Sequence, residues 1–318
     1  MPAPLHLVVG AGPVGTAVAD QLVDAGANVR IVTRSGGGPE HPAVERVAAD
    51  AANTERLTAL GRGAVAIYNC VNPSYHRWTR DWPPVATALL AAAEAADAVL
   101  VTCSNLYVYG PTPAALTEPG LGEDLPLAAT GVKGRVRARM WADALAAHEA
   151  GRVRVTEVRG SDYLGATANS QVGDTVVPRL LRGRTARVIG DPTVPHAFTH
   201  VADVARLLVT AAADERAWGR AWHVPSHPAR PIQRVVDDLA EVAGVPTVRV
   251  AQIPAVVRRG AALVVPFLRE MPEVMHQHNR PWHLDSRAAQ TTFDLHPTPW
   301  EEILRHHLAP YLVSTAAA

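Results

Sequence analysis

Short apolar runs and longer helical patterns alternate along the first half of the chain. Leu5–Val9, Asn28–Val32 and Ala98–Ser104 are apolar runs of the length that forms buried strands. Val14–Ala25 and Lys133–Ala150 have the pattern of helices. The same patterns predict more elements in this half, namely a short third strand near Val47–Ala49, helices at Thr54–Gly61 and Pro83–Ala96, and strands at Ala64–Cys70 and Arg152–Arg159. We therefore predict the α/β fold class, with a Rossmann-type doubly wound parallel sheet.

The alternation weakens after Gly160, and proline recurs from Pro192 to Pro254, which is typical of turns between short elements. The patterns indicate mixed strands and helices at Val176–Leu181, Ala186–Gly190, Val201–Ala213 and Ala221–Val224. They indicate helices at Ile232–Ala243, Pro254–Val264 and Glu301–Leu308. We expect a Rossmann domain made of residues 1–160 and about 195–225. A smaller, mostly helical substrate-binding lid domain is expected at residues 161–194 and 226–318.

A glycine-rich turn follows the first predicted strand directly. Residues 10–15 read Gly-Ala-Gly-Pro-Val-Gly, a G-x-G-x-x-G pattern in the strand–turn–helix context that dinucleotide binding requires. Gly10 permits the tight turn, Gly12 lets the backbone approach a pyrophosphate, and Gly15 lets helix and strand pack closely. The helix N-terminus favours the phosphates through its free N–H groups and its dipole. The predicted cofactor-binding residues of this turn are Gly10, Gly12, Pro13, Val14 and Gly15.

The end of the second predicted strand distinguishes NAD from NADP. An acidic residue there would hold the ribose hydroxyls of NAD and repel the 2′-phosphate of NADP. The chain has Arg34 and Ser35 instead, which can pair with that phosphate and donate a hydrogen bond to it. We predict that NADP(H) is preferred over NAD(H). Asp50 is a weaker candidate at the adenine edge, and Cys70 is a further cofactor-binding candidate.

Three segments carry a resemblance to one enzyme family. Ser104–Gly110 (SNLYVYG) resembles its S-S-x-x-V-Y-G, and Phe198–Ala205 (FTHVADVA) resembles its F-x-H-V-x-D-V-A. Asp285–Ser286 followed by Pro297–Glu302 (PTPWEE) resembles its D-S…P-T-P-x-E-E. Most of the chain is thereby similar to the extended branch of the short-chain dehydrogenase/reductase superfamily, the NAD-dependent epimerase/dehydratase-like proteins, in an atypical form. The resemblance implies an NAD(P)H-dependent oxidoreductase.

The chain departs from this family at the catalytic Tyr-x-x-x-Lys pair. Lys133, the single lysine of the chain, fits the family's lysine, to which the resemblance assigns the nicotinamide ribose. Ala129 stands where the family has tyrosine, and an alanine cannot transfer a proton. The family's Ser or Thr that holds the carbonyl oxygen matches Asn105, with Ser104 one residue earlier. The expected catalytic residues are Ser104, Asn105 and Lys133, and the proton donor stays open among Tyr107, Tyr163, a histidine, water and a substrate hydroxyl.

One replacement and several aromatic residues bear on the substrate. Sugar-nucleotide enzymes of the family carry R-D-F or R-D-Y, with the arginine on the substrate diphosphate, where this chain reads His196-Ala197-Phe198. We expect Tyr107, Tyr163, His196 and Phe198 to face the substrate in an apolar pocket that suits a flat aromatic ketone. The predicted function is an NADPH-dependent ketoreductase for an angucyclinone-type aromatic polyketide. The alternatives are a sugar-nucleotide epimerase or dehydratase, with Arg280 available for a phosphate, and a non-catalytic NADP-sensing protein.

The composition argues against other partners. Lys+Arg and Asp+Glu are both 30, so there is no net charge to attract nucleic acid or a membrane. Two cysteines and the lack of a signal-peptide pattern or membrane-spanning run lead us to expect a cytoplasmic protein. His276-Gln277-His278 and His283 form the densest histidine cluster, but no cysteine or carboxylate cluster accompanies them, so no metal is predicted. Both a monomer and a homodimer remain open.

Overall fold

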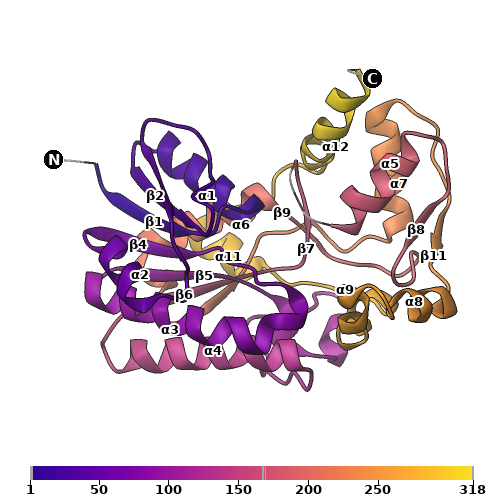
Figure 1. Ribbon diagram of the computed structural model, residues 1–318. Coiled ribbons are helices and arrows are strands. Elements are labelled where there is room, and N and C mark those ends of the chain that lie inside the picture. Colours follow the sequence, from indigo (N-terminus) through magenta and orange to yellow (C-terminus); the bar gives the residue numbers. More distant parts are fainter. Residues whose placement is uncertain (1–2, 167, 169, 317–318) are drawn as a thin grey trace. The chain divides into compact units, whose positions relative to one another are not determined.

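The computed structural model describes residues 3–166, 168 and 170–316, and the chain divides into two compact units. Figure 1 shows the elements of both units along the chain. Unit 1 consists of three segments, Met1–Val108, Ala129–Arg159 and Val204–Val224. Unit 2 consists of the other three, Tyr109–Ala128, Gly160–Asp203 and Pro225–Ala318.

Unit 1 is built on a seven-stranded sheet with the order β10-β6-β5-β4-β1-β2-β3. β1 pairs in parallel with β2 and β4, β2 with β3, β4 with β5, and β6 with β10. The strands are β1 Leu5–Val9, β2 Asn28–Thr33, β3 Val44–Ala48, β4 Ala64–Asn69, β5 Val99–Asn105, β6 Arg154–Gly160 and β10 Ala221–His223. This parallel sheet confirms the α/β, Rossmann-type fold class predicted from the sequence.

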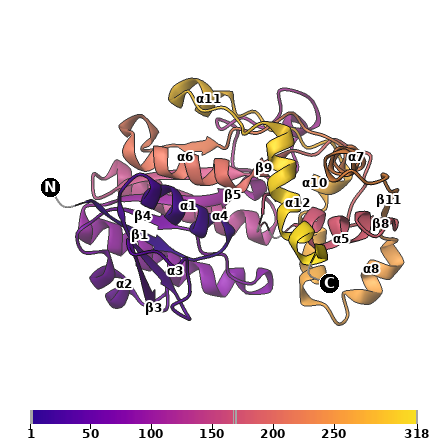
Figure 2. The ribbon, with the colours of Figure 1, turned by 90° about the horizontal axis from the view of Figure 1, so that it is seen from above.

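Helices cover both faces of this sheet, as the strand composition requires. β1, β4 and β5 are buried along most of their length, so neither face can be left to solvent. Figures 1 and 2 show two helices on one face, α1 Pro13–Asp24 and α6 Val201–Ala213. The other face carries α2 Thr54–Gly61, α3 Trp78–Ala96 and α4 Val132–Glu149.

The strand order reverses beside β1, and this reversal brings two distant segments together. β1 has β2 on one side and β4 on the other, with Val9 opposite both Val32 and Asn69. The residues that follow β1 and β4 therefore emerge at the same edge of the sheet, at the position where doubly wound folds bind their ligands.

Helix α3 begins at Trp78, five residues before the predicted start at Pro83. The Ala- and Leu-rich run predicted a helix from Pro83, a residue type that also favours the first helical turn. In the structure Pro83 and Pro84 lie inside the helix. The extra turn is held by the indoles of Trp78 and Trp82, which are buried, and Trp78 Nε1 donates to Pro73 O at 2.9 Å.

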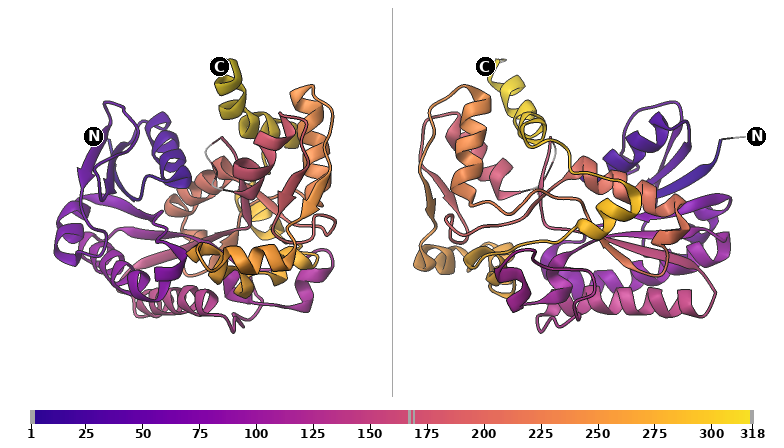
Figure 3. Two further views of the ribbon diagram at one scale, coloured as in Figure 1. Left: turned by 45° about the vertical axis from the view of Figure 1, so that its right-hand side comes forward. Right: turned by 180° about the vertical axis from the view of Figure 1, so that it is seen from behind.

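Unit 2 combines short strands and helices around its own core. Parallel pairs join β7 Asp162–Leu164 to β9 Phe198–His200 and β8 Ala186–Val188 to β11 Val250–Gln252. The helix α7 Ile232–Ala243, orange in Figure 3, has the predicted bounds and packs against α5 Val177–Leu180 and α12 Trp300–Ala316. The remaining helices are shorter, namely α8 Ala255–Ala261, α9 Pro266–Glu270, α10 His276–Asn279 and α11 Arg287–Phe293. Within the described ranges no helix has both the length and the apolar character needed to cross a membrane.

The division into units differs from the expected domains in two segments. Residues 109–128 belong to unit 2, because Leu121 N donates to His283 O at 3.0 Å and Leu121 forms a parallel bridge with Leu284. Residues 195–203 also belong to unit 2, because β9 pairs with β7 rather than with the large sheet. Both contacts join residues far apart in the sequence, which hydrophobic periodicity does not register.

Candidate functional site

The glycine turn of unit 1 packs as tightly as the pattern requires. A Cβ at Gly15 would lie 1.9 Å from Gly10 O, and one at Gly10, where φ is +104°, would lie 2.6 Å from Cys70 O. A Cβ at Gly12 would meet no atom within 4 Å. Two glycines therefore close the turn against the protein, whereas the third leaves open space beside its backbone.

The start of α1 offers free amides at this open space. Gly12 caps the helix without a side-chain hydrogen bond, and Pro13 has no N–H to donate. The amides of the first helical turn have no partner within a helix and point along its axis, where the helix dipole also favours an anion. The turn thus fits a pyrophosphate group. Cys70 lies beside it, and burial, together with the neighbouring Cys103, raises the pKa of the Cys70 thiol, which stays neutral.

The residues predicted for the adenosine end lie on two adjacent loops. Arg34 and Ser35 follow β2 and are exposed, so both side chains are accessible to a ligand. Asp50 follows β3, which pairs with β2. The Asp50 carboxylate accepts a hydrogen bond from Ala52 N at 3.0 Å, so one of its oxygens serves the local turn.

The predicted catalytic residues of unit 1 differ in their surroundings. Ser104 is buried, and its hydroxyl has no hydrogen-bond partner among the described residues. Asn105 Oδ1 accepts from Tyr107 N at 3.1 Å, which fixes the backbone after β5. Lys133 is only 1% exposed at the start of α4. Ala129 lies before this helix, where its amide donates to Val108 O at 3.2 Å.

Two tyrosines meet beside Lys133. The hydroxyl oxygens of Tyr75 and Tyr107 lie 2.5 Å apart, and the Lys133 ammonium lies 5.5 Å from the centre of the Tyr75 ring. Trp78 supports both rings, with ring centres 5.1 Å from Tyr75 and 6.1 Å from Tyr107. Gly134 allows this packing, because a Cβ there would lie 2.4 Å from Tyr107 O. Unit 1 therefore holds two phenols and a cation in one cluster.

A separate cavity of about 460 Å³ lies between α3 and α4 of unit 1. Its lining includes Leu90, Val136, Met140 and Glu157, and no residue of the glycine turn. Neither Lys133 nor the two tyrosines line it. The cavity is thus distinct from the cofactor-binding candidates.

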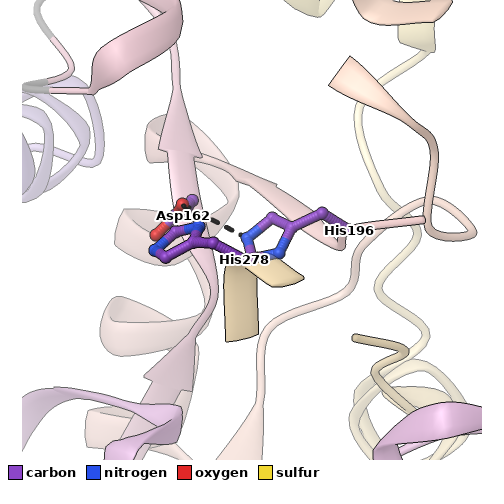
Figure 4. Close-up of side chains that lie close together, drawn as sticks. All are labelled: Asp162, His196 and His278. Atoms are coloured by element: carbon purple, nitrogen blue, oxygen red, sulfur yellow. Dashed lines mark ion pairs between the residues drawn. The ribbon is translucent and has the colours of Figure 1, made fainter. Parts of the chain in front are cut away.

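The predicted substrate residues of unit 2 have different environments. Phe198 is 6% exposed and belongs to the core of the unit. The Tyr163 ring packs beside Gly160, where an added Cβ would lie 2.9 Å from the ring. His196 is 3% exposed and stands in a cluster with Asp162 and His278 (Figure 4).

The two histidines of this cluster lie close enough to Asp162 to change its pKa. His196 Nε2 lies 3.2 Å from Asp162 Oδ2, and His278 Nδ1 lies 3.8 Å from the same oxygen. Burial alone would raise the pKa of Asp162, but the two histidines outweigh it and hold that pKa at about 2. Burial lowers the pKa of His278 to about 4 against the opposing effect of Asp162. At neutral pH the cluster therefore contains a carboxylate and a neutral His278.

Comparison with known proteins places the chain in a family. A family model described as the NAD dependent epimerase/dehydratase family matches residues 6–224. The chain belongs to this family. A comparison with curated proteins finds no match.

Solved structures share the fold at low sequence identity. dTDP-glucose 4,6-dehydratase from Bacillus anthracis str. Ames, in complex with NAD, is 18% identical with a TM-score of 0.77, over 99% of this chain and 98% of that one. UDP-N-acetylglucosamine 4-epimerase from Methanobrevibacter ruminantium M1 is 14% identical with a TM-score of 0.79, over 99% and 100%. UDP-glucose 4-epimerase from Thermotoga maritima is 16% identical with a TM-score of 0.76, over 98% and 99%. The family model confirms the family resemblance stated from the motifs, and these structures show the shared fold.

Three residues of these clusters are absent from the set predicted from the sequence. Tyr75 lies in a short 3-10 helix outside every motif, and nothing in its sequence neighbourhood indicates that it meets Tyr107. Asp162 and His278 are brought to His196 from distant segments, β7 and α10. His276, which the histidine pattern grouped with His278, instead packs against Trp282 with ring centres 5.3 Å apart.

Proposed function

We propose that the chain is an NADP(H)-dependent oxidoreductase that interconverts a carbonyl and an alcohol on a small molecule. The observation that carries this proposal is the Tyr75–Tyr107 pair beside Lys133, which supplies a proton donor where Ala129 replaces the family's tyrosine. Hydride addition to a carbonyl carbon requires a proton for the oxygen, and a phenol is a suitable general acid.

The cofactor is assigned to the residues that fit it in unit 1. The turn at residues 10–15 would hold the pyrophosphate, and Lys133 would hold the nicotinamide ribose. Arg34 and Ser35 would hold the 2′-phosphate that separates NADP from NAD. When bound, the nicotinamide supplies the hydride in reduction and accepts it in oxidation.

The geometry of the tyrosine pair indicates how the substrate oxygen would receive its proton. During reduction, one phenol gives its proton to the substrate oxygen as the hydride adds to carbon, so the carbonyl becomes a hydroxyl. The phenolate that remains accepts a hydrogen bond from the second phenol, whose oxygen lies 2.5 Å away. The Lys133 ammonium over the Tyr75 ring stabilises the negative charge. Water returns the proton after product release.

The substrate is proposed in two classes. One class is the aromatic ketone of a polyketide. His196 favours it, because it stands where sugar-nucleotide enzymes of the family have an arginine that binds diphosphate. The aromatic residues predicted to face the substrate favour it as well. A sugar nucleotide is the second candidate, and the comparisons support it better. The three proteins described above are named for nucleotide sugars, and the family is that of epimerases and dehydratases.

Loss of dihydronicotinamide absorbance tests the proposal. The protein is mixed with NADPH and with either angucyclinone-type ketones or nucleotide keto-sugars, and formation of product is followed by mass. Turnover of the first panel supports the ketoreductase, and turnover of the second supports the sugar-nucleotide enzyme. NADPH binding without turnover on either panel contradicts both and favours the NADP-sensing alternative.

A further inference from the structure

Asp162, His196 and His278 converge in unit 2 from three separate elements. Asp162 opens β7, His196 lies just before β9, and His278 lies in α10. One nitrogen of each imidazole and one carboxylate oxygen all lie within 4.8 Å of one another. Figure 4 shows the three side chains close together, with a dashed line between His196 and Asp162. The proposed oxidoreductase chemistry of unit 1 does not use any of these residues.

The hydrogen bonding of His196 determines which of its nitrogens is available. His196 Nδ1 lies 2.9 Å from Gln277 O, and because a carbonyl only accepts, Nδ1 carries the proton and donates. In the neutral ring Nε2 then presents a lone pair. This nitrogen is buried, has no hydrogen-bond partner among the described residues, and faces the Asp162 carboxylate at 3.2 Å. Two acceptors at this distance repel each other unless a proton or a metal cation lies between them.

Protonation of both histidines does not meet this need. The rings of His196 and His278 are stacked, with centres 5.2 Å apart and planes inclined by 21°. Two stacked imidazolium ions would repel each other. The carboxylate and the two imidazoles offer one oxygen and two nitrogen donor atoms, all within 4.8 Å of one another.

We propose that Asp162, His196 and His278 bind a divalent transition-metal ion, with Zn²⁺ the preferred ion. Two imidazoles and a carboxylate form a donor set that zinc accepts, with bonds of about 2.0–2.2 Å and tetrahedral donor–donor spacings of about 3.3 Å. The two spacings to Asp162 Oδ2, 3.2 and 3.8 Å, bracket that value, and all three donor atoms lie within 4.8 Å of one another. The Nδ1–H bond from His196 to a backbone carbonyl is the usual support of a metal-binding histidine.

The ligands are held by the backbone around them. His196 exchanges two hydrogen bonds with Arg230, at 3.1 and 2.9 Å. His278 O accepts from Asp191 N at 2.8 Å, and a Cβ at Gly190 would lie 2.5 Å from His278 Cβ and O. Asp162 is 36% exposed, which gives an ion access from solvent. Three protein ligands leave at least one coordination position for water or a substrate oxygen.

Metal titration of the intact chain without a histidine tag tests this proposal. The protein is stripped with a chelator, and Zn²⁺ is titrated in competition with a chromophoric chelator, while Co²⁺ is titrated as a spectroscopic probe. We expect one ion per chain and the visible absorption of four- or five-coordinate Co²⁺. Asp162→Asn and His278→Gln should each weaken binding by at least about tenfold. His296→Gln, whose side chain is 74% exposed, is the matched control and should bind as the parent does.

Two further results decide the outcome. X-ray absorption of the zinc-loaded parent, which needs no variant to fold, should show two imidazoles and oxygen ligands. Equal affinity of the parent and Asp162→Asn would place any metal elsewhere and overturn the proposal. Failure of the parent to bind Zn²⁺ would overturn it as well.

Discussion

The phenolic oxygens of Tyr75 and Tyr107 lie 2.5 Å apart, although a strand and a helix separate the two residues in the chain. Tyr75 stands in the segment after β4, and Tyr107 follows β5, which is the neighbour of β4 in the sheet. Parallel neighbours end at the same edge, so the topology brings the two phenols together. The chain can therefore lose a helical tyrosine and still hold a phenol close to Lys133.

Removal of either hydroxyl should reduce turnover and spare the fold. Tyr75→Phe and Tyr107→Phe keep the ring packing with Trp78 but delete the proton donor or its partner. General acid catalysis contributes about 10²–10⁴-fold, so kcat should fall by at least about tenfold for the residue that faces the substrate. Steady-state kinetics with NADPH would measure it, with Tyr311→Phe in unit 2 as the control. Unchanged kcat in both variants would assign the proton to water or to the substrate.

Alanine substitutions at two glycines of the turn should have different effects, one on NADPH affinity and the other on the stability of unit 1. Gly12→Ala places its methyl group in open space, so the free energy of unfolding should change by less than about 0.5 kcal/mol. The same methyl occupies the approach of the pyrophosphate, and the affinity for NADPH should fall by at least about tenfold. Gly15→Ala would bring a methyl to 1.9 Å from Gly10 O and should instead destabilise unit 1. Calorimetric titration and urea unfolding distinguish the two effects, and full NADPH affinity in Gly12→Ala would contradict the assignment.

The parts of the candidate cofactor site that depend on local order can be predicted from the sequence. The glycine turn, Arg34 and Lys133 sit at fixed offsets from strands and helices, and a strand–turn–helix pattern places them without knowledge of distant contacts. Tyr75 could not be identified in this way, because its role depends on the adjacency of β4 and β5. The prediction of no metal, which stays a prediction, was based on the lack of a carboxylate near His278 in the sequence. Asp162 reaches that histidine only after β7 has paired with β9.

Replacement of Arg34 should alter the choice of cofactor. A hydrogen bond to a charged group contributes about 1.5–3 kcal/mol, so Arg34→Ala should weaken NADPH binding by about 10- to 100-fold. NADH lacks the 2′-phosphate, and its affinity should stay nearly constant. Arg62→Ala, which also removes an exposed arginine of unit 1, is the control for loss of positive charge. Equal losses of NADPH and NADH affinity in Arg34→Ala would show that Arg34 contacts adenosine without reading the phosphate.

His307 should make the stability of unit 2 sensitive to acid. Its side chain is 1% exposed, and Nδ1 lies 3.0 Å from Gly165 O and 3.1 Å from Gly165 N. Burial lowers the pKa of His307, although the Gly165 carbonyl and Asp174 act against that shift. Because the folded pKa lies below the unfolded value of about 6.5, the unfolded chain takes up the proton first as the pH falls.

The contribution of His307 is therefore complete above about pH 6.5 and is lost as the pH falls through the folded pKa. His307→Gln cannot take up this proton, so its free energy of unfolding should fall less between pH 8 and pH 5 than that of the parent. Urea unfolding at a series of pH values measures the two slopes, with His296→Gln as an exposed-histidine control that keeps the parent slope. Identical slopes for His307→Gln and the parent would mean that other histidines with a lowered pKa, such as the half-buried His6, carry the acid sensitivity.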